Sequence, residues 1–294
     1  MFLNSGIIRS VLSVSVVIIL AAASSASSQD VTMEKDISYS DNGHDRCRMD
    51  LYLPAAGEGN GAAVFLIHGG GWKGGDRTQW EDLAGSLAAR GYVCASAGYR
   101  LVPEVLYPLP VEDIRLAMSL FKDMAEKYNF DPARIGAAGS SAGGHLTALL
   151  ATISPEDNLG RHPKLASADT RPAAVALYNP VLDFVEEAGG IESAQNFLGG
   201  SYEQCSEAYL EASPARRIDH NFPPVLMLYG TDDTLTPVSN CVAMADSLFA
   251  LGIPCEIALF PGQKHGFGYR LQNSEQKRAA LMVGDFFDRY LLKD

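Results

Sequence analysis

A serine between two glycines lies at the boundary between an apolar run and a helical pattern. The stretch is Gly139-Ser140-Ser141-Ala142-Gly143, which has the pattern Gly-x-Ser-x-Gly with Ser141 at its centre. A strand that turns sharply into a helix holds such a serine in strained backbone, and the glycines let strand and helix approach closely. The hydroxyl then lies at the carboxyl end of the sheet, where the helix N-terminus favours an oxyanion. We therefore predict that Ser141 is a nucleophile.

A serine nucleophile requires a base, and the base requires an acid that orients it. His265 follows the apolar run in "EIALFPGQKHGFG", whose glycines let the loop curl back over the sheet edge. Asp232 and Asp233 follow another apolar run, in "VLMLYGTDDTLTP", and both are candidates for the acid. The resulting chain order of Ser, Asp and His is the one expected of α/β hydrolases.

A glycine-rich segment, "FLIHGGGWKGGD" at residues 65–76, supplies the second part of the predicted chemistry. Three glycines after a strand can turn backbone N–H groups toward one point, and the amide of Ala142 can join them in stabilising a tetrahedral oxyanion. A phosphate-binding loop is the competing interpretation, but neither Gly-x-x-x-x-Gly-Lys-Ser/Thr nor Gly-x-Gly-x-x-Gly occurs here. Trp72 either lines the acyl pocket or packs in the core, and His68 is expected to brace the loop.

The remaining histidines and the cysteines are assigned no chemistry. His145 is expected to be structural, because it points along the helix flank rather than toward the turn that carries Ser141. The other three histidines lie in polar or irregular stretches and are interpreted as surface residues: His44, His162 and His220. Five cysteines lack metal-site spacing, and their odd number leaves at least one thiol unpaired: Cys47, Cys94, Cys205, Cys241 and Cys255. We predict neither a metal nor an organic cofactor, and the disulfide pairing stays open.

Short apolar runs alternate with helical patterns along most of the chain. The apolar runs lie at 63–67, 92–96, 134–139, 173–178, 225–229 and 256–260, and the helical patterns at about 78–90, 111–128, 142–154, 238–251 and 274–292. Such alternation predicts an α/β fold with a mostly parallel central sheet and helices on both of its faces. Residues 36–54 alternate around an Asn-Gly pair and predict an opening N-terminal β-hairpin.

Residues 182–222 interrupt this alternation of apolar runs and helical patterns with short, mixed stretches. A long irregular excursion in an α/β domain usually lies over the binding face. The segment is therefore either an insertion that forms a wall or lid of the site, or a plain surface insertion.

The N-terminus has the pattern of a secretion signal. Arg9 is followed by mostly apolar residues at 11–23 and then by small residues. The apolar run is short for a membrane span, which needs about 20 residues. We predict a signal peptide at 1–28, a single hydrolase domain at 29–294, and a secreted or periplasmic protein without membrane insertion after cleavage. An uncleaved anchor is the alternative.

The chain is acidic. Its formal net charge is −12, and removal of the +1 charge of Arg9 with the signal would make it −13. Such a charge disfavours nucleic acid and anionic membrane surfaces as partners. It is compatible with a small ester or an acylated neutral polysaccharide as the substrate, and it leaves the oligomeric state open.

Five motifs occur in the order seen in the α/β-hydrolase fold: "HGGGW", "GYRLVPE…YPLPVEDI", "GSSAGGHL", "GTDDTLTP" and "KHGFG". Over about residues 60–290 the chain resembles the hormone-sensitive-lipase-like and the feruloyl/acetyl-xylan-esterase-like (BD-FAE-like) branches of the serine esterases. Within the second motif, Arg100 and Asp113 are expected to form a structural ion pair.

The resemblance implies specific roles for the site residues. Ser141 would be the nucleophile and His265 the base, while the backbone amides of Gly70, Gly71 and Ala142 would stabilise the oxyanion. The resemblance also implies that this chemistry needs neither a metal nor an organic cofactor.

Two details narrow the resemblance. Many hormone-sensitive-lipase relatives have Asp before the serine, whereas Ser140 stands there in this chain, and together with Trp72 this favours the exported carbohydrate-esterase branch. The usual family spacing is Gly-x-x-Asp with a proline four residues after the acid, which selects Asp233 and leaves Asp232 as a turn residue that caps nearby amides.

The expected activity is that of an exported serine carboxylic-ester hydrolase that acts on short-acyl esters through a covalent acyl-enzyme. Acetyl or feruloyl groups on plant polysaccharide are the substrates that the resemblance suggests. The alternatives are a serine peptidase or an arylformamidase-type amide hydrolase, although related peptidases usually carry a large extra domain. A more remote alternative is a non-catalytic hydrolase-fold binding protein, which typically lacks one of the three catalytic residues.

Overall fold

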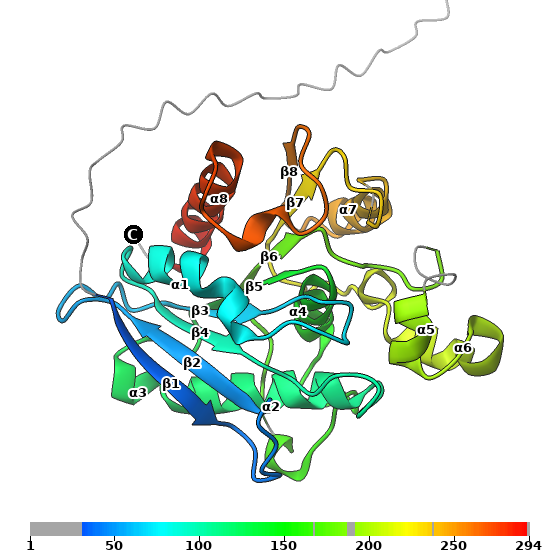
Figure 1. Ribbon diagram of the computed structural model, residues 1–294, viewed down its shortest axis with the longest axis horizontal. Coiled ribbons are helices and arrows are strands. Elements are labelled where there is room, and N and C mark those ends of the chain that lie inside the picture. Colours follow the sequence, from blue (N-terminus) through cyan, green and yellow to red (C-terminus); the bar gives the residue numbers. More distant parts are fainter. Residues whose placement is uncertain (1–30, 167, 187–191, 237, 293–294) are drawn as a thin grey trace, which may run out of the picture.

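An eight-stranded sheet forms the centre of the computed structural model, which describes residues 31–166, 168–186, 192–236 and 238–292 (Figure 1). The predicted signal peptide at 1–28 lies outside the described residues. The strands are β1 (Thr32–Ser38), β2 (Arg48–Leu53), β3 (Ala63–Ile67), β4 (Val93–Ala97), β5 (Ile135–Ser140), β6 (Ala174–Tyr178), β7 (Val225–Gly230) and β8 (Cys255–Phe260).

The strands lie in the order β1-β2-β4-β3-β5-β6-β7-β8. Neighbouring pairs from β4 to β8 are parallel, whereas β2 is antiparallel to both β1 and β4. The predicted mostly parallel sheet is therefore confirmed, and the opening hairpin is formed by β1 and β2. Ile67 at the end of β3 pairs with Gly139 of β5, so the segments that follow these two strands emerge side by side.

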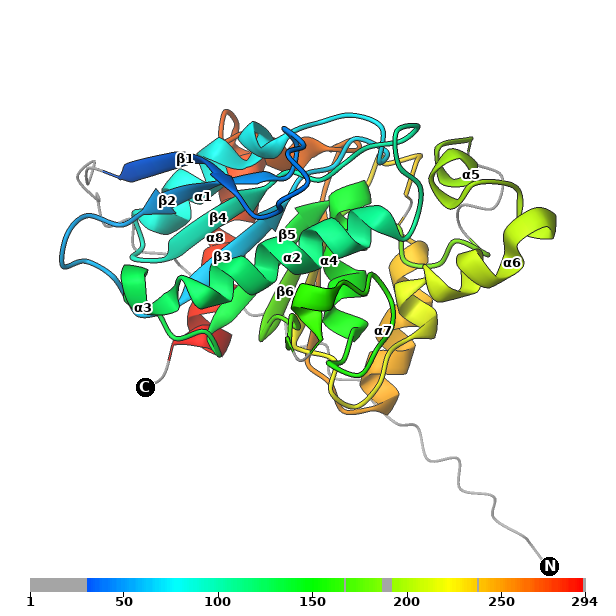
Figure 2. The same ribbon diagram turned by 90° about the horizontal axis from the view of Figure 1, so that it is seen from below.

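Helices cover both faces of this sheet. They are α1 (Glu81–Ala88), α2 (Leu109–Asp123), α3 (Ala125–Tyr128), α4 (Ala142–Thr152), α5 (Glu192–Leu198), α6 (Tyr202–Glu211), α7 (Asn240–Ala250) and α8 (Ser274–Leu291). Short 3-10 turns are η1 (Arg77–Trp80), η2 (Pro163–Leu165), η3 (Pro214–Arg216) and η4 (Phe267–Tyr269). Helices α1 and α8 pack on one face, and α2, α4 and α7 pack on the other, as Figures 1 and 2 show.

Two helical patterns differ in detail from the prediction. The pattern at 111–128 forms two helices, α2 and α3, which meet at Met124, whose amide is shared between the carbonyls of Leu120 and Phe121. The pattern at 78–90 begins with η1 and continues as α1.

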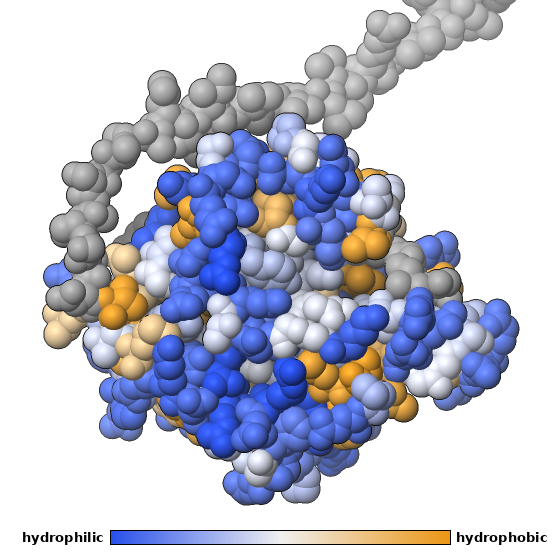
Figure 3. Space-filling model, in the orientation of Figure 1, coloured by the Kyte–Doolittle hydropathy of each residue, from blue (hydrophilic) through white to orange (hydrophobic). Residues whose placement is uncertain are grey.

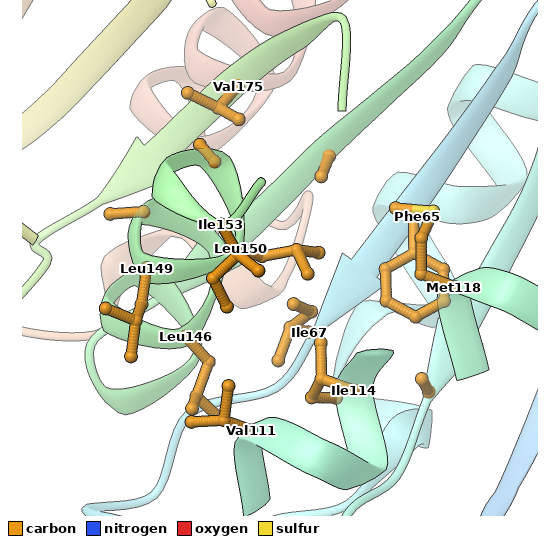
Figure 4. Packing of buried hydrophobic residues seen from close by; sticks show 14 of the residues in the cluster. Phe65, Ile67, Val111, Ile114, Met118, Leu146, Leu149, Leu150, Ile153 and Val175 are labelled. Atoms are coloured by element: carbon orange, nitrogen blue, oxygen red, sulfur yellow. The ribbon is translucent and has the colours of Figure 1, made fainter. Parts of the chain in front are cut away.

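The core beneath the predicted site is formed by α2 and α4 against the centre of the sheet (Figure 4). The side chains that meet there come from β3 (Phe65, Ile67), β6 (Val175), α2 (Val111, Ile114, Met118) and α4 (Leu146, Leu149, Leu150, Ile153). Every residue of α4 is buried. Because each buried aliphatic side chain contributes about 1.5–3 kcal/mol, this packing holds the helix that follows Ser141 in place.

Two glycines permit the close approach of α4 to the sheet. An ideal Cβ on Gly143 would lie 2.1 Å from the carbonyl oxygen of Ile67, and one on Gly139 would lie 2.2 Å from the carbonyl oxygen of Gly143. Both distances are well below van der Waals contact, so neither position accepts a side chain unless the helix moves. The glycines on either side of Ser141 are therefore required by packing.

The segment 182–222 carries α5, α6 and η3 and lies at one side of the molecule, away from the centre of the sheet (Figures 1 and 2). Its aromatic residues Phe184 and Phe197 are fully buried and belong to the main core cluster. The segment therefore packs onto the domain rather than extending from it.

The cysteines form no disulfide. All five are thiols outside any disulfide, and Cys94 is buried in β4 as expected. Within the described ranges, no helix is long and apolar enough to cross a membrane. The same part of the chain holds no group of three or more His, Cys, Asp or Glu side chains suited to a metal ion.

Candidate active site

Ser141 lies at the sharp turn between β5 and α4. Its backbone has φ 56° and ψ −121°, a region that a non-glycine residue enters only at an energetic cost. The strained turn is held from both sides, because the Ser141 amide donates to the Tyr178 carbonyl at 2.8 Å and its carbonyl accepts from the His145 amide at 2.8 Å. The strain predicted for this serine is thus observed, and its hydroxyl is directed out of the sheet edge.

A chain of hydrogen bonds connects Ser141, His265 and Asp233. The Ser141 hydroxyl donates to Nε2 of His265 at 2.7 Å, and Nδ1–H of His265 donates to Oδ2 of Asp233 at 2.8 Å. These three residues follow β5, β8 and β7, so the parallel sheet brings their loops to one edge. The arrangement has the geometry of a nucleophile, a general base and an orienting acid.

The carboxylate of Asp233 is fully buried and well supplied with donors. Besides His265, it accepts from the amides of Leu235 at 2.8 Å and Thr236 at 2.9 Å, and from Nδ2 of Asn179 at 2.6 Å. Burial raises the pKa of Asp233, but the hydrogen bonds from His265 and the Thr236 amide outweigh it, so the net pKa lies below its ordinary value. The group is therefore an anion that stabilises a positive charge on His265.

The neighbouring Asp232 has a different environment. Its side chain is exposed and contacts the Thr231 hydroxyl at 3.1 Å, rather than capping backbone amides as expected. The contact with His265 is made by Asp233, the aspartate that the family spacing favours.

The glycine-rich segment after β3 approaches Ser141 from the adjacent strand. Gly70, Gly71 and Trp72 all have positive φ values, 118°, 59° and 58°. An ideal Cβ on Gly70 would lie 2.3 Å from the Gly74 carbonyl oxygen, so this tight turn requires glycine. Gly70 and Gly71 line the same pocket as Ser141, and Ala142 begins α4, where its amide has no helical partner.

His68 braces this turn, as expected. Its Nδ1–H donates to the Gly69 carbonyl at 2.8 Å, and its ring stacks on Tyr99 with the centroids 4.3 Å apart. Burial lowers the pKa of His68 to about 4, so the ring is neutral.

Trp72 both lines the pocket and packs in the core. Its side chain is 2% exposed and stacks on Phe197 with the ring centroids 4.7 Å apart. Its indole N–H donates to Nδ1 of His145 at 3.3 Å, and Nε2–H of His145 donates to the Ala212 carbonyl at 2.8 Å. His145 is therefore structural, and it connects the glycine-rich segment, α4 and the segment 182–222.

The pocket above Ser141 has a volume of about 290 Å³. Besides the predicted residues, its walls include the apolar Val181, Ala194 and Leu235 and the polar Gln79, Thr236 and Tyr269. Sequence reasoning missed these six and also Ser193, a seventh lining residue, because most of them lie in irregular segments without a recognisable pattern. Ala194 belongs to the segment 182–222, which therefore forms a wall of the pocket.

Comparisons with known proteins agree with this arrangement. The model of the BD-FAE family matches residues 49–248, a range that includes Ser141 and Asp233 and ends before His265. A "probable carboxylic ester hydrolase LipM" of Mycobacterium tuberculosis is 30% identical over 271 residues, covering 88% of this chain and 61% of the relative. An acetylxylan esterase of Xylanibacter ruminicola is 28% identical over 236 residues, covering 79% and 46%. The chain thus spans about half to three fifths of these relatives.

Solved structures share the fold. Esterase B from Lactobacillus rhamnosis, in an inhibited form, superposes with a TM-score of 0.77 at 25% identity, covering 89% of this chain and 87% of that one. A carbohydrate esterase from gut microbiota has a TM-score of 0.76 at 20% identity, with 90% and 98% covered. The match of the family model to residues 49–248 shows that the chain belongs to the BD-FAE family, and the α/β-hydrolase architecture agrees with it.

Proposed function

We propose that the protein is a serine carboxylic-ester hydrolase whose catalytic residues are Ser141, His265 and Asp233. The observation that carries this proposal is the hydrogen-bond chain among these residues at the base of a pocket bounded by the glycine-rich turn. The family membership and the relatives named as esterases support it.

The reaction proceeds through an acyl-enzyme. Oγ of Ser141 attacks the ester carbonyl carbon while Nε2 of His265 takes the hydroxyl proton. The amides of Gly70, Gly71 and Ala142 stabilise the oxyanion of the tetrahedral intermediate, and each such donor is worth about 10²–10³ in rate. The carbon–oxygen bond to the alcohol then breaks, and His265 protonates the departing oxygen. A water molecule, deprotonated by His265, attacks the acyl-enzyme and releases the acid and the Ser141 hydroxyl.

The substrates are esters of short acyl groups, from acetyl to butyryl, on a carbohydrate alcohol. The pocket is small, and Trp72, which forms one of its walls, is held against Phe197 and His145 and therefore has little freedom to move. The relative named as an acetylxylan esterase supports an acetylated polysaccharide as the natural substrate. A secreted or periplasmic location, proposed from the N-terminal pattern, would bring the enzyme to such a polymer.

Two measurements test the proposal. A fluorophosphonate probe should label the wild-type protein at Ser141. Ser141→Ala should abolish the labelling and lower kcat at least about 10⁴-fold. Ser140→Ala is the matched control, because Ser140 is buried beside Ser141 but lies outside the hydrogen-bond chain. Comparable loss in Ser140→Ala would overturn the assignment of the nucleophile.

The acyl preference is tested with p-nitrophenyl esters of increasing chain length and with a feruloyl ester. We expect kcat/KM to be highest between acetate and butyrate. Faster hydrolysis of a C10 ester than of acetate would contradict the proposed short-acyl specificity. N-terminal sequencing of the protein recovered outside the cytoplasm tests export, and an intact Met1 on that protein would contradict cleavage.

A further inference from the structure

A second cavity of about 520 Å³ is lined by residues that directly follow pocket residues in two segments, Lys73 after Trp72 and Gln195 after Ala194. We call it the side groove and define it by six of its lining residues: Lys73, Val102, Leu106, Gln195, Asn196 and Gln204. We propose that the side groove binds the sugar units that flank the acylated residue of a glycan substrate. The inference rests on the proposed esterase function, which it extends from the reacting ester to the polymer that carries it.

The side groove and the catalytic pocket share two walls. Gly71 and Ser193 line the pocket and face each other, since an ideal Cβ on Gly71 would lie 3.6 Å from Cβ of Ser193. Farther along the same two segments, Lys73 and Asn196 line the side groove. Sugar units attached to the reacting ester can therefore extend along these two segments from the pocket toward the side groove.

The two sides of the side groove differ in polarity. Val102 and Leu106 form an apolar side, and Leu106 is 43% exposed. Figure 3 shows apolar side chains gathered beside α5, where Figure 1 places the segment that leads from β4 into α2. The other side carries the amides of Gln195, Asn196 and Gln204, of which Oε1 of Gln204 already accepts from the Ser201 amide at 2.8 Å. A pyranose ring likewise presents C–H groups on its faces and hydroxyls on its rim, and amides both donate to and accept from hydroxyls.

The charge of the side groove suits a glycan. Among the described residues that line it, no carboxylate is present, and Lys73 carries the charge. In a chain with a formal net charge of −12, this is a locally non-acidic surface. Lys73 has three N–H donors for ring and hydroxyl oxygens.

The walls of the side groove are preformed. The Tyr107 amide donates to the Phe197 carbonyl at 2.9 Å, and the Val102 amide donates to the Trp72 carbonyl at 3.0 Å, so the two sides are joined through the backbone. The expected ion pair of Arg100 is present as well, with Nη2 of Arg100 2.6 Å from the buried Oδ1 of Asp113. Such walls lose little conformational freedom when a ligand binds, which favours affinity.

The experiment compares two esters in the wild type and in three variants. The esters are p-nitrophenyl acetate, which has no sugar, and an acetylated xylo-oligosaccharide. Asn196 is exposed on α5, so Asn196→Trp fills the side groove without disturbing the core, and Asn196→Ala removes only the amide. Asn221→Ala is the matched control, since Asn221 is an exposed asparagine outside both cavities.

We expect the ratio of kcat/KM for the oligosaccharide to kcat/KM for p-nitrophenyl acetate to fall about tenfold in Asn196→Trp. The ratio should fall several-fold in Asn196→Ala and less than twofold in Asn221→Ala. An unchanged ratio in Asn196→Trp, in a protein with wild-type melting behaviour, would overturn the inference.

Binding provides a readout that does not depend on turnover. Calorimetry with Ser141→Ala should detect the unacetylated xylo-oligosaccharide, and the double variant Ser141→Ala, Asn196→Trp should bind it at least tenfold more weakly. Equal affinity in both proteins would contradict the inference. If the wild type hydrolyses neither ester, the proposed function fails, whereas hydrolysis of p-nitrophenyl acetate with an unaltered ratio counts against the side groove alone.

Discussion

At the scale of single residues, the environment of Asp233 separates it from Asp232. Asp233→Asn replaces a buried anion by a neutral amide that favours the wrong tautomer of His265, so we expect kcat to fall about 10⁴-fold. Asp232→Asn changes an exposed side chain and should leave kcat and the melting temperature close to wild type. Assays of both variants at pH 7.5 test this, and an inactive Asp232→Asn beside an active Asp233→Asn would reverse the assignment.

Asn179 is a positioning residue for the same carboxylate. It has a positive φ of 44°, and its Nδ2 donates to Oδ2 of Asp233, the oxygen that also accepts from His265. Asn179→Asp keeps the shape but places a second carboxylate beside the first, which raises the pKa of the pair. We expect kcat to fall about tenfold or more, with a smaller loss in Asn179→Ala.

The comparison of the two Asn179 variants distinguishes charge from shape. If electrostatics dominate, the loss of kcat in Asn179→Asp should become smaller at higher pH. The two neighbouring carboxylates then no longer share a proton, so Asp233 can orient His265 as an anion. Equal and pH-independent losses in both variants would indicate that only packing at this position matters.

At the scale of elements, Trp72 and His145 connect three segments that are distant in the sequence. The hydrogen bond between them fixes the indole that follows Gly70 and Gly71, so it should also fix the turn whose amides we propose to stabilise the oxyanion. We expect His145→Leu to lower kcat about tenfold and Trp72→Phe, which lacks the N–H, to lower it to a similar extent.

A double-mutant cycle tests this connection. The loss in His145→Leu should nearly disappear when Trp72 is already Phe, because residues that act through one contact are not additive. His145→Gln, which retains an acceptor and a donor, should recover part of kcat. Fully additive losses, with no recovery in His145→Gln, would show that His145 acts only through general packing.

The element scale also shows what could be predicted from the sequence. Ser141 and His265 were predictable, because each lies in the segment after an apolar run and the carboxyl ends of parallel strands meet at one edge. The choice of Asp233 required a family spacing, since strand alternation ends before it. Tyr269 and Gln79 could not be predicted as pocket residues, because they belong to 3-10 turns whose approach to Ser141 depends on the packing of α8 and α1.

At the scale of the whole molecule, two buried histidines make stability depend on pH. Burial lowers the pKa values of both His68 and His145 to about 4. Between about pH 6.5 and 4 the unfolded chain binds protons at these sites and the folded chain does not, so the free energy of unfolding decreases as the pH falls. From pH 7 to pH 5, each histidine should contribute a loss of about 2 kcal/mol.

Urea denaturation at pH 7 and pH 5 measures this loss. In His145→Gln the decrease between the two pH values should be smaller than in the wild type by about 2 kcal/mol, whatever the stability of the variant at pH 7. Asp233, whose pKa is lowered, stabilises the fold above the pKa of an unfolded aspartate. It therefore changes the free energy of unfolding mainly at still lower pH. An identical decrease in both proteins would contradict the lowered pKa of His145.

Trp72 both lines the pocket and packs in the core, and this restricts how the proposed esterase can acquire new substrates. A smaller side chain at this position would widen the pocket, but it would also remove a packing partner of Phe197 and Phe184 from the core. Acceptance of larger acyl groups would therefore coincide with a loss of stability. Leu235 and Ser193 border the same pocket with far less buried packing, and Leu235 is 60% exposed. Natural divergence or laboratory selection for longer acyl groups should therefore accumulate substitutions at these positions and leave the tryptophan unchanged.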